Sequence, residues 1–166
     1  MAHEHIEWMA KILLLVDRTY TWIGHKYGEG RLYGSLNVEG VSTELDAPRL
    51  SAFFGQKPAE GTRSPALARE KIARLRAQPD YHQSSWLSRN PAEAQYAGAI
   101  RLPETAAPLG FMAWSGFPEL TDEAYMLAVA VRVGLMNREE ALVIAKISAN
   151  PYFEIMARDL YEVPMF

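Results

Sequence analysis

The 166-residue sequence contains no cysteine. A chain without cysteine forms no disulfide, has no thiolate nucleophile and offers no sulfur ligand to zinc or an iron–sulfur cluster. It also lacks any apolar run close to the roughly 20 residues that span a membrane. The apolar stretch at residues 12–16 is too short for the core of a secretory signal. We therefore expect a cytoplasmic protein that does not insert into a membrane.

The sequence also lacks an excess of positive charge. Its 17 Lys and Arg residues stand against 20 Asp and Glu residues, so the formal net charge is −3. Broad nucleic-acid binding needs a basic surface that displaces counterions, and this composition disfavours it. Hydrophobic residues make up 49% of the chain and charged residues 22%, which is typical of a globular protein. The length suits one domain over residues 1–166.

Helical periodicity is the main structural signal in the sequence. Residues 4–27 carry an apolar stripe at alternating spacings of three and four, which favours a helix over the strand that "RTYTW" suggests. Ser64-Pro65 begins a second helix that stops before Pro79. The stripe of the first helix consists of Ile6, Met9, Leu13, Val16, Tyr20, Ile23 and Tyr27.

The remaining segments predict further helices and little strand. Asp46 is placed to cap a short helix over residues 47–54, and residues 28–45 suit a weak hairpin or an ordered loop. Three helices follow in the last 46 residues, and the one at 122–134 has a single charge in its body, which predicts a core position. We predict a mainly α, compact single-domain helical bundle with at most one short β-hairpin, or a strand near 110–114. The alternative is an α+β fold.

Local motifs for catalysis are weak. Ser115 lacks the flanking glycines of a nucleophile elbow, and Gly116 with Pro118 explains a sharp turn there without any chemistry. Asp122-Glu123 and Glu139-Glu140 lie where helices begin, and acidic residues are expected there for the helix dipole. The four histidines show no metal-ligand spacing. We therefore assign no catalytic residue, metal or cofactor, and catalysis by residues that are scattered in the sequence stays an open alternative. The histidines are His3, His5, His25 and His82.

A helix-turn-helix unit over residues 122–148 is one functional alternative. Ala130 and Gly134 match the Ala-x-x-x-Gly centre of that motif. The helix that would read DNA begins with Arg138, Glu139 and Glu140, and two acidic residues at that end would be repelled by phosphates. Nucleic-acid binding is therefore disfavoured.

Residues 110–124, "GFMAWSGFPELTDEA", resemble a segment of GlcG-like haem-binding proteins, in which a strand, a Ser-Gly pair and an acidic turn lead into a helix. The residues that carry the resemblance are Gly110, Ser115, Gly116, Asp122 and Glu123. "ILLLVD", at 12–17, is similar to that family's early strand. The resemblance implies a small-ligand or haem-binding protein.

Residues 69–100 are similar in rhythm to helical stretches of phage and prophage assembly proteins: a helix, a Pro-Asp stop, a loop and a second helix. Four Trp, eight Tyr and seven Met residues supply the apolar surface that is enriched at interfaces. Our leading hypothesis is a non-enzymatic protein that binds a protein partner or itself. Helix 65–77 is the one basic surface, through Arg63, Arg69, Lys71, Arg74 and Arg76. The candidate partner-binding residues are Arg69, Arg76, Tyr81, His82 and Trp86.

Overall fold

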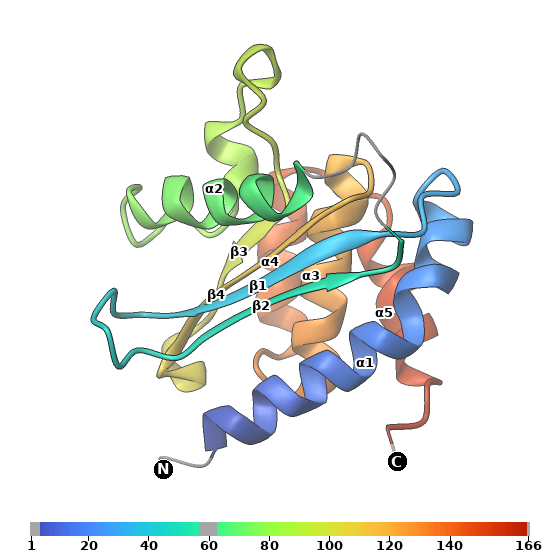
Figure 1. The fold of residues 1–166 in the computed structure, drawn as a ribbon, viewed down its shortest axis with the longest axis horizontal. Helices are drawn as coiled ribbons and strands as arrows, with labels where there is room; N and C mark the ends of the chain where they lie inside the picture. The colour runs from blue at the N-terminus through green and yellow to red at the C-terminus, as the bar shows by residue number, and fades with distance from the viewer. Residues whose placement is uncertain (1–3, 57–62, 166) are drawn as a thin grey trace.

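The computed structural model describes residues 4–56 and 63–165, and these form a four-stranded antiparallel sheet with five α-helices (Figure 1). The prediction of a mainly α bundle is therefore wrong, and the fold is α+β. The strand order in the sheet is β2-β1-β4-β3. The elements are α1 (Glu4–Tyr27), β1 (Gly34–Gly40), β2 (Arg49–Phe54), α2 (Ser64–Arg76), β3 (Ala99–Arg101), β4 (Leu109–Ser115), α3 (Glu119–Val133), α4 (Arg138–Ile147) and α5 (Phe153–Tyr161), with short 3₁₀ turns at Ser85–Ser88, Pro91–Glu93 and Glu104–Ala106.

Helices cover both faces of the sheet. Leu36, Met112 and Trp114 point into the main core with α1, α3 and α5, whereas Phe111 and Ala113 pack under α2. Figure 1 shows α2 on one side of the sheet and α1 on the other. Because successive side chains of a strand point to opposite faces, β4 contributes to both cores and all its residues are buried.

The predicted helix after Asp46 is wrong. Residues 49–54 form β2, which pairs antiparallel with β1 so that Val38 lies opposite Leu50. This edge strand packs its alternate apolar residues, Leu50 and Phe54, against the main core. The tertiary pairing with β1 overrides the weak local preference for a helical turn.

Most of the helix predictions are confirmed. The 24-residue α1 matches the predicted 4–27 segment, and α4 begins with the capping box of Asn137 and Glu140. The central helix α3 is buried almost throughout, as its single body charge predicts. It begins earlier than the sequence indicates, with Pro118 rather than Thr121 at the cap. Among the described residues, no helix has both the length and the apolar character that a membrane crossing requires.

Candidate functional site

A cavity of about 430 Å³ lies between the N-termini of α2 and α3. Its size falls within the range of small-molecule sites. The segment after α1, the start of α2, the loop before β3 and the turn from β4 into α3 all contribute to its wall. The lining residues are Arg31, Tyr33, Arg63, Ser64, Leu67, Lys71, Tyr96, Ser115, Gly116, Phe117, Pro118, Glu119 and Asp122.

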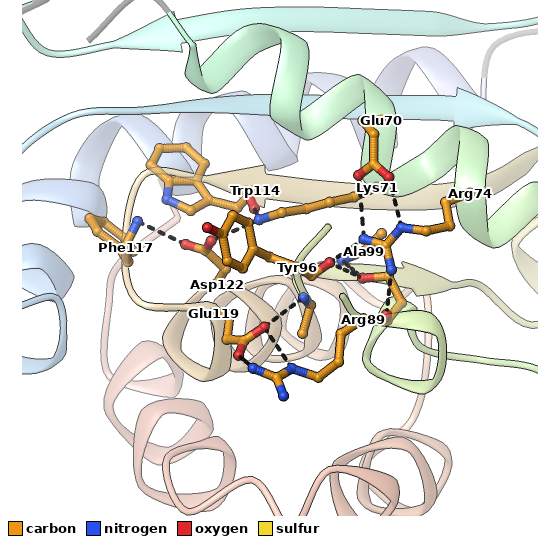
Figure 2. A network of polar contacts seen from close by, with 12 residues as sticks. Glu70, Lys71, Arg74, Arg89, Tyr96, Ala99, Trp114, Phe117, Glu119 and Asp122 are labelled. Carbon is orange, nitrogen blue, oxygen red and sulfur yellow. Dashed lines mark hydrogen bonds and ion pairs between the residues drawn. The ribbon is translucent and has the colours of Figure 1, made fainter. Parts of the chain in front are cut away.

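The inner wall of the cavity contains a buried ion pair between α2 and α3 (Figure 2). The Lys71 Nζ donates to Asp122 Oδ2 at 2.9 Å and to the carbonyl oxygen of Trp114 at 2.8 Å. The two side chains are 2% and 3% exposed. The pair therefore links α2, the end of β4 and α3 through one ammonium group.

Lys71 belongs to the buried face of α2, so its predicted place on a basic surface is wrong. It follows Ala68 by three residues and precedes Leu75 by four, and both are fully buried. Gly98 makes room for the amine, because a Cβ at that position would lie 2.6 Å from Lys71 Nζ. Gly98 also has a φ of +127°, which disfavours any other residue.

Asp122 is the carboxyl group of this pair. Besides the bond from Lys71, its Oδ1 accepts a hydrogen bond from the backbone N–H of Phe117 at 2.9 Å. Burial raises the pKa of Asp122 to about 7, although the charges of Lys71 and, more weakly, Arg31 lower it. This carboxyl group therefore changes its charge near neutral pH.

The outer rim of the cavity is positively charged. Arg31 and Arg63 are both exposed, and the one described ion pair of Arg31 is a long contact of 3.8 Å with the exposed Glu29. The first turn of α2 contains no acidic residue, and its cap residue Arg63 makes no capping hydrogen bond through its side chain. The positive end of the helix dipole makes this end of α2 attractive to an anion.

The acidic residue Glu119 on the cavity wall is already compensated. It accepts hydrogen bonds from the Arg89 guanidinium and from the backbone N–H of Ala97, at 3.0 Å for the latter (Figure 2). Asp122 is likewise paired with Lys71. Within residues 4–56 and 63–165, Arg63 makes no ion pair and Arg31 makes only the long contact with Glu29, so these two arginines are the least compensated positive groups of the cavity lining.

Glu123 lies outside the cavity, although it is the neighbour of Asp122 in sequence. It is fully buried and accepts hydrogen bonds from the hydroxyls of Ser84 and Ser148 and from the amide of Asn150. Burial raises its pKa above the usual value, while these three donors lower it. Glu123 thus joins α3 to the loops before β3 and before α5. The prediction that it only complements the helix dipole is therefore incomplete.

The predicted partner-binding residues on α2 differ in their exposure. Arg69 is exposed. Arg76 instead donates to the carbonyl oxygen of Val41 at 2.7 Å and pairs with Glu39 of β1 at 3.1 Å. Arg74 is also drawn inward, where it pairs with Glu70. Of the predicted basic surface of α2, only Arg63 and Arg69 are thus exposed.

The other three candidates lie in the segment after α2. Tyr81 is exposed, and its ring meets His82 edge-on with 4.8 Å between the ring centroids. Trp86 is partly buried under the Arg89 guanidinium, which lies 4.5 Å from the ring centroid. None of the five candidates lines the cavity. A partner for them remains a prediction.

The predicted turn at 115–118 forms part of the cavity wall. Gly116 approaches the chain before β1 so closely that a Cβ there would lie 2.3 Å from the carbonyl oxygen of Tyr33. Ser115, Gly116 and Asp122 of the GlcG-like segment line the cavity, whereas Gly110 and Glu123 do not. Residues 12–17, similar to an early strand of that family, lie within α1.

Comparisons with protein-family models, with curated proteins and with solved structures find no match to this chain. In the described ranges 4–56 and 63–165, no cluster of three or more His, Asp or Glu side chains is arranged to hold a metal ion. The candidate site therefore depends on the geometry of the cavity alone.

Proposed function

We propose that this protein binds a small organic anion, with a carboxylate as its head group, in the cavity between α2 and α3. The observation that carries the proposal is the positive rim. Two exposed arginines and the N-terminus of α2, whose cap residue Arg63 makes no side-chain capping hydrogen bond, border a cavity whose described acidic lining residues are already paired. Anions bind favourably at such helix ends, and a guanidinium binds a carboxylate through two parallel hydrogen bonds.

The rest of the wall suits a short carbon chain. Leu67, Phe117 and Pro118 offer apolar surface, and Tyr33 and Tyr96 offer rings with a polar hydroxyl. A dicarboxylate such as succinate would match the two guanidinium groups at the rim, so it is a suitable probe. Permanent charge on both partners makes this binding sensitive to salt.

Haem is a less suitable ligand for this cavity. Among the described residues that line it, none is a histidine or a methionine, and Tyr33 and Tyr96 are the side chains of a type that ligates haem iron. Binding of a protein partner remains a separate prediction for the surface around Arg69 and Tyr81. The acidic start of α4, with Glu139 exposed, gives no support to DNA reading.

Isothermal titration calorimetry with acetate, succinate and sulfate at low salt tests this proposal. The matched variants are Arg31→Gln at the rim and Arg69→Gln. The second removes an arginine of α2 that is also exposed but does not line the cavity. Loss of a charge-assisted hydrogen bond costs about 1.5–3 kcal/mol, so Arg31→Gln should weaken succinate binding by roughly tenfold or more. Arg69→Gln should bind like the unaltered protein.

The proposal fails if none of the three anions gives a saturable heat. It also fails if both variants lose affinity equally, because binding would then reflect the general positive charge of the surface and not a site at the cavity rim.

A further inference from the structure

We propose that the anion enters the cavity together with a proton, and that Asp122 is the group that receives this proton. The inference rests on the proposed function and adds a specificity-determining residue to it. In this proposal the anion binds next to a protonated, uncharged Asp122. Attraction to the arginines at the rim is then not the only source of its affinity.

The geometry of Asp122 allows it to take up a proton without losing its partners. Oδ1 accepts one hydrogen bond, from Phe117 N–H, and Oδ2 accepts one, from Lys71 Nζ. Each carboxylate oxygen can accept two hydrogen bonds, so with the donors of the described residues alone one lone pair on each oxygen remains for a proton. Asp122 lines the cavity, so the carboxyl group lies at the wall of the site where the anion is proposed to bind.

The charged and titratable groups around Asp122 come from every side of the cavity. Glu119, one turn earlier on α3, is held by Arg89 and by the Ala97 N–H, and β4 contributes the uncharged Trp114 carbonyl. The groups are Lys71 from α2, Arg63 directly before α2, Arg31 and Tyr33 from the segment before β1, Tyr96 from the loop before β3, and Glu119 from α3.

Binding of an anion at Arg31 is coupled electrostatically to Asp122. In the free protein, burial raises the pKa of Asp122, and Lys71 and Arg31 oppose that rise. An anion on the Arg31 guanidinium cancels part of the opposing charge and brings a like charge into a cavity of low dielectric. Both effects favour the protonated carboxyl group, and the anion then becomes the counter-ion of Lys71.

The coupling has a definite sign. Because the complex holds the proton more tightly than the free protein, affinity must fall as pH rises from near 7, by at most about tenfold per pH unit for one proton. At a pH well below 7, Asp122 is protonated in both states, so the affinity becomes independent of pH. The site therefore releases its ligand on the alkaline side of neutrality.

The test is calorimetry of succinate binding at pH 7.5 or so in Bis-Tris and in Tris, two cationic buffers with different heats of ionisation. Succinate keeps a constant charge there, because its carboxyl groups ionise in the acidic range like those of Asp and Glu. The difference in heat between the buffers counts the protons taken up. Because about a quarter of Asp122 is already protonated in the free protein at this pH, we expect an uptake of roughly half to three-quarters of a proton per succinate bound.

Two variants assign the proton. Asp122→Asn should abolish the uptake and make affinity nearly independent of pH, whereas Glu123→Gln, which removes a buried carboxyl group outside the cavity, should keep the uptake. If Asp122→Asn does not fold, the proton count of the unaltered protein still decides, since binding with no uptake overturns the inference and leaves the proposed function standing. Uptake that persists in a folded Asp122→Asn variant also overturns it. If no anion binds, the proposed function and this inference both fail.

Discussion

Replacement of Lys71 with methionine tests the role of the buried ion pair. Methionine keeps the unbranched apolar length but removes the ammonium that bonds to Asp122 at 2.9 Å and to Trp114 at 2.8 Å. Removal of one partner from a buried pair typically costs about 3–5 kcal/mol, because the other charge is left without compensation. We expect Lys71→Met to lose about this much free energy of unfolding at pH 8.5.

The cost should depend on pH in a direction set by Asp122. The pKa of Asp122 rises on folding from 3.8 to about 7. The stability that this group adds to the folded protein is therefore present in full below pH 3.8 and is lost as the pH rises through 7. That shift corresponds to about 4 kcal/mol, at 1.36 kcal/mol per pKa unit. In Lys71→Met the pKa of Asp122 must rise further, since Lys71 lowers it.

At pH 5.5, Asp122 is protonated in the folded protein, and no full ion pair is lost on substitution. The destabilisation by Lys71→Met should then be roughly half of its value at pH 8.5 or less. Urea unfolding followed by tryptophan fluorescence measures both values. Arg69→Met, on the exposed side of the same helix, should change stability by no more than about 0.5 kcal/mol. Equal destabilisation by Lys71→Met at the two pH values would refute the reasoning.

Three further substitutions test other parts of the fold by the same unfolding assay. Gly98→Ala should lower the free energy of unfolding by about 1–3 kcal/mol from its backbone conformation alone. The loss should be larger because the new methyl group meets Lys71 Nζ, and a loss below about 0.5 kcal/mol would contradict the close contact. Glu123→Gln should flatten the fall of stability with rising pH, because burial raises the pKa of Glu123 and its charged form opposes folding; an unchanged pH profile would count against this. Asn137→Ala should cost about 1 kcal/mol through loss of the capping box at α4, with exposed Lys146→Ala as a neutral comparison.

The helices could be predicted because their signals are local. The stripe of α1 and the Asn137–Glu140 box of α4 each lie within a few turns of one segment. The sheet could not be predicted in the same way. All seven residues of β4 are buried, so the strand shows no polar alternation, and β2 depends on its pairing with β1.

The candidate site was hidden for a related reason. Arg31, Lys71 and Asp122 lie far apart in the sequence and come together only because the segment after α1, helix α2 and helix α3 border one cavity. One local signal was present: Ser64, Ala68, Lys71 and Leu75 follow spacings of four, three and four, which places Lys71 on the buried stripe of α2. A lysine at such a position predicts a buried partner.

The central claim is that an anion binds between the N-termini of α2 and α3. The most direct measurement is a titration of the ¹⁵N-labelled protein with succinate, followed by two-dimensional NMR of the backbone amides. We predict that the amides of Ala66, Gly116 and Glu119 shift together along one saturable curve, while that of Lys146 on α4 stays in place. Shifts that do not saturate, or that gather away from this cavity, would contradict the claim.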